Sequence, residues 1–437
     1  MQFEKPLLVR ETIGSSSIGA QHSPRWSIVA LLTIAITIAY IDRINLSSAL
    51  PEIRKSIPLS PGASGMLLSA FFWSYATLHI PAGWLVDRIG VKWPLAAAFF
   101  LWSCASAATA LMSTLTGLIF LRILLGIGEA IVVPASMRYM RTNFPEKERG
   151  LPVGIYFAGT KFGPAIGAPV ATYLVLGYGW QSMFVLTGIV SLLWLVPWLL
   201  LMRSDSGAKP RQAEDTIPEP LESSSLESSS WRTLLSTPVM WGTILGTFCY
   251  NYFVYFCMTW MPTYFKERHG LSLTESGWFT FMSFGGMATI AILGGWAADR
   301  LITRGHNPVT VRKGFTMVGF VLAFSVLIGA YADSPSVSLF FAVFSLIGLG
   351  LATANYWALT QTLMPSGAIG RVAGIQNAAA SSAGIAAPWI TGLLIEKTGN
   401  FDAPVKAIGL WLAIGLSSYL LLVREKYAPR LKNGESG

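Results

Sequence analysis

Charged residues are scarce in this sequence: Asp, Glu, Lys and Arg account for 12% of its 437 residues, about half the share of about 25% in typical soluble domains. Cysteine and histidine are rarer still, with three and four copies. The cysteines all lie within predicted spans and form no disulfide or metal-ligand pattern. No His, Cys and Asp residues stand at the spacing of metal ligands, and the polar segments are too short for a catalytic or signalling domain. We therefore expect neither an enzyme nor a receptor, and no metal or other cofactor.

Hydrophobic residues make up 53% of the chain and are concentrated in runs long enough to cross about 30 Å of hydrocarbon. The runs predict an all-α membrane protein with twelve transmembrane helices. Their predicted positions are residues 26–49, 62–85, 93–112, 115–137, 151–175, 180–202, 238–262, 276–298, 314–332, 337–362, 372–395 and 405–423.

The chain divides into two similar halves. Residues 203–230 are rich in proline, serine and acidic residues, a composition that cannot bury enough apolar surface to fold. Residues 83–88 (GWLVDR), after the second span, recur as residues 295–300 (GWAADR) after the eighth. Parallel repeats of this size are found in transporters that bind substrate between their halves near the bilayer midplane. We expect a disordered tail at 1–24, six-helix halves at 25–202 and 236–424, a cytoplasmic linker at 203–235 and a tail at 425–437.

Lysine and arginine are unevenly distributed between the two sides of the predicted spans. Of the 31 such residues, few fall in the loops opposite the termini: Arg54, Lys55, Lys266, Arg268, Lys397 and Lys406. The positive-inside rule then places both termini in the cytoplasm, and the short loops favour a bacterial inner (plasma) membrane. The same asymmetry explains the net charge of +9, so we expect no nucleic-acid partner.

Ionisable residues also occur inside the predicted spans: Asp42, Arg43, Arg122, Glu129 and Lys161. If each faced lipid, insertion would cost on the order of 12 to 17 kcal/mol, so we expect them to contact one another or a polar cavity. Three are basic and two are acidic, which leaves a positive charge for an anion to balance. Because arginine can donate two parallel hydrogen bonds to a carboxylate, an organic acid is the expected substrate.

Helical spacing groups these residues on shared faces. Arg122 and Glu129 are seven residues apart, which is two helical turns, and Asp42 and Asn45 are three apart. A carboxyl group near an arginine in a low-dielectric site is favoured as the anion by the charge and as the neutral acid by desolvation. Substrate binding can shift this balance, so Asp42 and Glu129 are candidates for proton coupling. A purely structural ion pair between Asp42 and Arg43 is the alternative.

Four motifs carry a family resemblance: YIDRIN at 40–45, GWLVDRIGVK at 83–92, RILLGIGE at 122–129 and FPEKERG at 144–150. They are similar to those of the major facilitator superfamily, and within it to the anion:cation symporter family of bacterial sugar-acid permeases and sialin-like proteins. The resemblance implies a proton-coupled symporter in which Arg122 holds the substrate carboxylate and Asp42 and Glu129 carry protons. Arg43 holds either Asp42 or the substrate. The remaining substrate-binding candidates are Tyr40, Asn45, Tyr75, Trp357 and Asn377.

Lys161, near the middle of the fifth span, departs from that family's pattern, in which this position is more often neutral. Either it binds a second anionic group, which would make the substrate a dicarboxylate or an aromatic acid, or it forms a salt bridge with Glu129. The second reading would remove Glu129 from proton coupling. Both alternatives stay open at the level of sequence.

The repeated loop motif predicts a conformational gate. Its residues are Asp87, Arg88, Asp299 and Arg300, joined by Arg149. A carboxylate in such a loop can cap a helix N-terminus or pair with a nearby arginine, here Arg138, Arg141 or Arg149. The resemblance implies that this loop stabilises the outward-facing state.

Together these features predict a monomeric, proton-coupled symporter that imports an organic anion such as a sugar acid by alternating access. Sodium is not excluded as the coupling ion. A drug or metabolite exporter of the same fold, working by proton antiport, is the main alternative. Such an exporter of cations needs an acidic or apolar interior, whereas the interior predicted here is basic.

Overall fold

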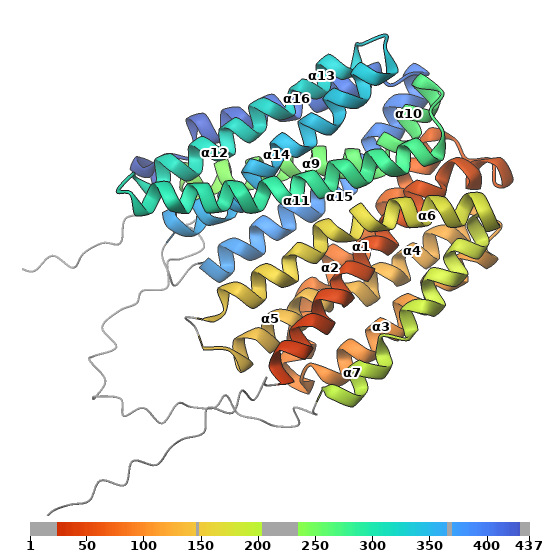
Figure 1. The fold of residues 1–437 in the computed structure, drawn as a ribbon, viewed down its shortest axis with the longest axis horizontal. Helices are drawn as coiled ribbons and strands as arrows, with labels where there is room; N and C mark the ends of the chain where they lie inside the picture. Colours follow the sequence, from red (N-terminus) through yellow and green to blue (C-terminus); the bar gives the residue numbers. More distant parts are fainter. Residues whose placement is uncertain (1–23, 146–147, 203–234, 365–368, 429–437) are drawn as a thin grey trace, which may run out of the picture.

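The computed structural model describes residues 24–145, 148–202, 235–364 and 369–428. In these residues the chain is almost wholly helical, and the helices form two bundles that lie side by side (Figure 1). The predicted tails and linker, at 1–24, 203–235 and 425–437, fall almost entirely outside the described part of the chain. Those three assignments stay predictions.

The first bundle contains residues 24–202. Its elements are α1 (Pro24–Ser56), α2 (Pro61–Ile89), α3 (Lys92–Ala108), η1 (Thr109–Leu111), α4 (Leu115–Glu129), α5 (Val132–Asn143), α6 (Gly150–Leu192) and α7 (Leu195–Leu201). α4 and α5 together form the fourth predicted span. The helix is interrupted directly after Glu129 because Pro134 has no N–H to donate to the carbonyl four residues before it. α6 covers the fifth span and most of the sixth, and Gly179 divides it with a positive φ of 85°, which glycine adopts without a steric penalty.

The second bundle contains α9 (Pro238–Thr259), α10 (Met261–His269), α11 (Leu273–Thr303), α12 (Pro308–Ala323), α13 (Ser325–Ala330), α14 (Pro335–Leu363), α15 (Ile369–Thr398), α16 (Asp402–Leu421) and η4 (Glu425–Tyr427). Its helix ends have recognisable signals. α10 ends at Gly270 in the left-handed conformation, and α11 begins with a capping box formed by Ser272 and Glu275.

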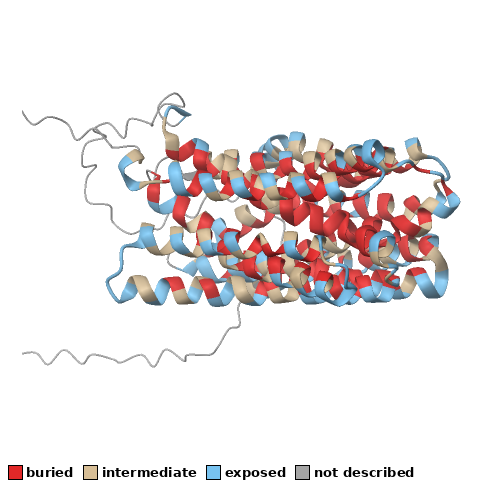
Figure 2. Cartoon of the chain, turned by 90° about the horizontal axis from the view of Figure 1, so that it is seen from above, coloured by how far each residue is buried: buried red, intermediate tan, exposed pale blue. Residues whose placement is uncertain are grey.

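Each predicted span coincides with one of these helices or with a consecutive pair. By length and apolar composition, nine helical stretches of the described residues qualify as membrane spans, and one of them, Gly150–Leu201, is long enough for two crossings. α2 and α9 supply the remaining two predicted spans. Buried residues gather along the interior of the bundle, and exposed residues cover its outer faces (Figure 2). The chain is therefore a multi-pass, all-α membrane protein, as the hydrophobic runs predict.

Matching contacts in the two bundles support the internal repeat. The Lys92 ammonium donates to the carbonyl of Leu199 at 2.9 Å, and the Lys313 ammonium donates to the carbonyl of Leu420 at 3.2 Å. In both pairs a lysine in one helix binds a carbonyl near the end of the last helix of its bundle. The two copies of the repeated loop motif also make the same contact, because Arg88 lies over the ring of Trp84 and Arg300 lies over the ring of Trp296.

Among the described residues, the ion pairs between the two bundles lie at one end. At the end formed by the α1–α2 and α10–α11 connections, Arg54 contacts Glu267 at 2.6 Å and Lys266 contacts Glu52 at 3.4 Å. There the backbone N–H of Gly62 also donates to the Glu396 carboxylate at 2.8 Å. At the opposite end, a Cβ added to Gly154 in α6 or Gly374 in α15 would meet no atom within 4 Å. The helices α2 and α15 thus close one end and leave the other open.

A bulky residue at Gly65 should prevent this closure. A Cβ at Gly65 would lie 2.5 Å from the Pro388 carbonyl oxygen and 3.1 Å from the Gly392 Cα, and backbone atoms cannot move aside as a flexible side chain can. In Gly65→Val we expect the closed end to open and uptake to fall at least tenfold. Ser69, buried one turn further along the same face of α2, can be replaced by cysteine as a reporter once the native cysteines are removed. Thiol labelling of this reporter should become faster.

Gly177→Val is the matched control, because a Cβ at Gly177 would meet nothing within 4 Å. It should leave both labelling and uptake unchanged. Equal labelling of the Ser69→Cys reporter in the Gly65→Val and control backgrounds would show that this end is not held closed by the contact between α2 and α15.

Candidate functional site

Charged side chains meet inside the first bundle, where α1 faces α4. The Arg43 Nε donates to Glu129 Oε2 at 2.8 Å, and the side chains are 5% and 0% exposed. An ion pair removed from water to this extent needs close geometry to offset the loss of hydration. The sequence left two partners open for Arg43, Asp42 or the substrate, and in this structure its partner is Glu129 instead.

Aromatic rings enclose the Arg43 guanidinium. Its central carbon lies 4.4 Å from the ring centroid of Tyr40, 4.6 Å from that of Phe71 and 4.6 Å from that of Tyr75. Cation–π contacts are strongest where the cation is desolvated. Tyr40 and Tyr75 were predicted from the sequence as substrate-binding residues, and here both contact Arg43.

Asp42 points to a different set of neighbours. Its Oδ1 accepts a hydrogen bond from Ser106 Oγ at 2.8 Å and a longer one from Asn45 Nδ2 at 3.5 Å, while Asn45 also donates to Thr187 at 3.3 Å. Successive residues of a helix point about 100° apart, which is why Asp42 and Arg43 have separate partners. The structural ion pair between them, the alternative reading of the sequence, is absent from the described contacts. Ser106 was missed, since a serine among small and apolar residues of a helix carries no signal of its own.

Arg122 keeps an unpaired donor inside the bundle. Its Nη1 lies 3.4 Å from the backbone oxygen of Asp42, and its Nη2 is buried and has no hydrogen-bond partner among the described residues. Leaving a buried donor unpaired costs about 1–3 kcal/mol, and more for a charged group. Asp42 Oδ2 and Glu129 Oε1 are buried without partners as well. The site therefore has one arginine donor and two acid oxygens without hydrogen-bond partners among the described residues.

The remaining substrate-binding candidates, Asn377 and Trp357, lie in α15 and α14 of the second bundle. On α15, Gly384 packs against Phe72, and half-buried Asn377 follows on the same face two turns closer to the open end. Trp357 in α14 is also half-buried, with its ring 5.5 Å from that of Tyr356. The structure does not bring Trp357 or Asn377 into direct contact with the arginines. It places Asn377 where the two bundles begin to separate.

Two second-half residues near the site were missed from the sequence. Tyr255 in α9 lies 4.7 Å, ring to ring, from Phe72 of the first bundle, which itself packs against Tyr75. Buried Gln376 donates to Thr247 and Thr360 at 3.2 and 2.9 Å, linking α9, α14 and α15. The neighbouring polar pair of Gln376 and Asn377 in a helix of small residues was the available signal for Gln376.

The predicted gate residues make contacts within each bundle. Asp87 Oδ1 is 3.3 Å from Arg138 Nη1, as one of the proposed pairings expected. Asp299 Oδ1 is 3.1 Å from Arg312 Nη2, a partner that the sequence reading did not consider. Arg149 binds the carbonyls of Phe144 and Arg141 at 2.9 and 3.0 Å, so it stabilises the end of α5 and makes no ion pair with Asp87.

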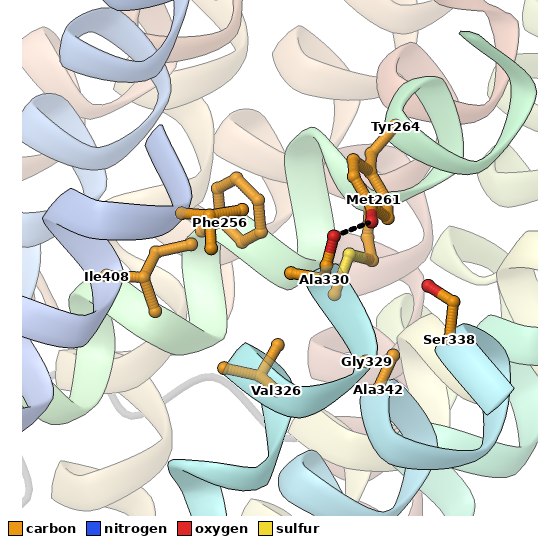
Figure 3. A pocket seen from close by; sticks show the side chains of 10 residues that line it. Phe256, Met261, Tyr264, Val326, Gly329, Ala330, Ser338, Ala342 and Ile408 are labelled. Carbon is orange, nitrogen blue, oxygen red and sulfur yellow. Dashed lines mark hydrogen bonds between the residues drawn. The ribbon is translucent and has the colours of Figure 1, made fainter. Parts of the chain in front are cut away.

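A small cavity lies apart from these charges, in the second bundle (Figure 3). Its lining is almost entirely apolar and includes Phe256, Met261 and Val326. The Tyr264 hydroxyl, at its edge, donates to the Ala330 carbonyl at 3.5 Å. The cavity measures about 10 Å³, at the lower limit for one water molecule. It therefore does not have room for an organic substrate.

Two helical bundles with charged side chains buried between membrane-spanning helices are typical of a membrane transporter. Within the described residues no three or more His, Cys, Asp or Glu side chains gather as metal ligands. The chain belongs to the major facilitator superfamily, whose family profile matches residues 32–388.

Several bacterial transporters resemble this chain over most of their length. It is 30% identical over 406 residues to a "probable sulfoacetate transporter" of Cupriavidus necator, covering 91% of this chain and 94% of that protein. It is 29% identical over 403 residues to a "probable L-galactonate transporter" of Escherichia coli, with coverages of 90% and 88%. It is also 29% identical over 425 residues to a "probable galactarate/D-glucarate transporter" of Bacillus subtilis, with 93% of each chain covered. Each of these relatives is named as a transporter of organic anions.

A solved structure has the same fold. A bacterial homologue of the human lysosomal transporter Spinster, crystallised in an inward-facing and unoccupied conformation, superposes with a TM-score of 0.78. The match covers 94% of this chain and 99% of the other at 19% sequence identity. At that identity the likeness concerns the fold alone, and it agrees with the two-bundle architecture described above.

Proposed function

We propose that this protein is a proton-coupled symporter that imports an organic anion, such as a sugar acid, by alternating access. The observation that carries the proposal is the buried Arg122, whose Nη2 has no hydrogen-bond partner among the described residues. A carboxylate would satisfy this donor, and its negative charge would lie beside the Arg122 guanidinium. The named substrates of the relatives, which are all organic anions, support the same class of substrate.

The arrangement supports a coupling mechanism between proton and substrate. Glu129 holds Arg43 at 2.8 Å, so protonation of Glu129 would release the Arg43 guanidinium to bind the substrate carboxylate together with Arg122. Loss of the proton would restore the ion pair and expel the anion. Asp42, which is bound to Ser106 and close to Arg122, is the second proton-carrying candidate.

Orientation belongs to the same proposal. The start of α1 and the end of α16 lie at the end where the bundles are apart (Figure 1). With both termini in the cytoplasm of a bacterial cell, as the distribution of lysine and arginine predicts, the structure is inward-open and its closed end faces outwards. We propose that the monomer is the working unit in the inner membrane, because one chain contains both bundles and the buried charges between its helices.

Uptake into proteoliposomes under an inward proton gradient tests the function. The assay would compare galactonate, galactarate, D-glucarate and sulfoacetate with a lipophilic cation. We expect at least one organic anion to accumulate, and its accumulation to collapse when a protonophore is added. Efflux of the lipophilic cation coupled to proton entry, with no anion transported, would replace this proposal by a cation exporter.

A further inference from the structure

Lys161 lies on the face of α6 that looks towards the second bundle. Residues 161, 165, 168 and 172 of α6 share this face by helical spacing. At Thr172 the face packs against α11, because a Cβ on Gly277 would lie 3.1 Å from the Thr172 hydroxyl oxygen. Glycines at 159, 163 and 167 form the opposite face and pack against α1. Lys161 therefore points away from α1 and towards the region between the bundles.

Along this face the packing changes at Lys161. Ala165 and Ala168 are 2% and 1% exposed, whereas Lys161 is half-buried and Gly154, two turns nearer the open end, is exposed with free space around it. Lys161 thus lies at the point where the bundles separate, as Asn377 does on α15. The flexible four-carbon stem of a lysine allows its ammonium to follow a ligand in such a place.

No acid of the described residues neutralises Lys161. Among the described residues it forms no ion pair and no hydrogen bond, and Glu129, which the sequence offered as its partner, binds Arg43 instead. Asp42 is bound by Ser106 and Asn45. An ionisable side chain inside a membrane span that faces the space between the bundles is a candidate for ligand binding, because such residues are costly to keep in the membrane.

The ionisable residues inside the spans indicate how many negative charges the ligand should carry. Arg43, Arg122 and Lys161 against Asp42 and Glu129 leave one positive charge, and protonating one acid raises the total to two. A substrate with two negative charges then makes the loaded carrier neutral, whereas a monoanion leaves one positive charge to be buried as the bundles close. Neutrality matters here because uncompensated charge is costly inside the bilayer.

We propose that the substrate is a dianion whose first carboxylate binds Arg122 and whose second anionic group binds the Lys161 ammonium across the site. The inference rests on the proposed function and narrows its substrate class. It assigns to Lys161 the choice between acids with one and with two anionic groups.

Matched pairs of acids test this assignment. Galactonate and galactarate differ only at the last carbon, which is a CH2OH group in galactonate and a carboxylate in galactarate. Glycolate and sulfoacetate differ in that the hydroxyl of glycolate is replaced by a sulfonate in sulfoacetate. Each acid would compete for uptake or binding in the wild type, Lys161→Gln, Lys161→Arg and the exposed control Lys406→Gln. We expect the dianion to compete at least tenfold better than its monoanion in the wild type. This ratio should disappear in Lys161→Gln, which restores the charge balance for a monoanion, and persist in Lys161→Arg and the control.

The outcomes separate the two proposals. Transport of organic anions with an unchanged ratio in Lys161→Gln would overturn the role of Lys161 and leave the symporter proposal intact. Equal binding of both members of each pair by the wild type would also overturn the role of Lys161 and leave the symporter proposal intact. If none of the acids is bound or transported, the proposed function itself fails, and this inference fails with it.

Discussion

Replacing Arg122 by glutamine should abolish uptake of the organic anion. Arg122 is 6% exposed and its guanidinium has one donor without a partner among the described residues, so a substrate carboxylate bound there forms charge-assisted hydrogen bonds away from water. Truncating one partner of such a buried pair costs 2–5 kcal/mol or more. At about 1.4 kcal/mol per tenfold change in affinity, we expect binding to weaken about thirtyfold or more. Direct binding of the transported acid by the purified protein measures the effect.

Arg122→Lys separates geometry from charge. Lysine keeps the positive charge but loses the planar fork that binds a carboxylate through two hydrogen bonds, so recovery should be minor. Arg141→Gln removes the same charge from an exposed position on α5 and should bind the acid normally. If Arg122→Gln binds the substrate as tightly as Arg141→Gln does, the carboxylate is held elsewhere, and Arg43 becomes the principal anion-binding residue.

The fold could be predicted from sequence because the bilayer permits few solutions. A spanning segment must satisfy its backbone hydrogen bonds internally, so each long apolar run must form a helix. Breaks in the helices also have physical causes that are visible in the sequence, as Pro134 and Gly179 show. What the runs do not define is how far a helix continues beyond the hydrocarbon. α1 and α11 both extend past their predicted ends, since polar residues such as Arg54 and Arg300 are good helix formers.

The members of the candidate site could be predicted better than their pairing. Burial cost alone singles out the ionisable residues of the spans, and four of the five, all except Lys161, are in fact buried. Spacing along a helix sets which residues share a face, but the rotation of α1 relative to α4 depends on packing between residues 86 positions apart. The Arg43–Glu129 pair was therefore not predictable from either helix alone. For the same reason the sequence could not decide whether Glu129 or a ligand would neutralise Lys161.

Glu129→Gln should separate substrate binding from proton coupling. Glutamine resembles protonated glutamate in shape, and both are uncharged. It therefore cannot form the ion pair with Arg43 that Glu129 forms at 2.8 Å. We expect this variant to exchange labelled for unlabelled anion across the membrane but to lose accumulation driven by a proton gradient. In the wild type, binding should strengthen as the pH falls, because protonation of Glu129 frees Arg43 for the anion. In the variant, Arg43 is always free, so this pH dependence should flatten.

The matched control is Glu148→Gln, which removes a carboxylate that is 57% exposed beside Arg25 and should keep both accumulation and pH dependence. Asp42→Asn tests whether Asp42 is the coupling acid instead. If Asp42 carries the coupled proton, Asp42→Asn will exchange the anion without accumulating it, and Glu129→Gln will still accumulate it. Gradient-driven accumulation that survives in Glu129→Gln would therefore exclude Glu129 as the coupling acid. The Arg43–Glu129 pair would then be a structural contact between α1 and α4, with its charges matched for stability and not for transport.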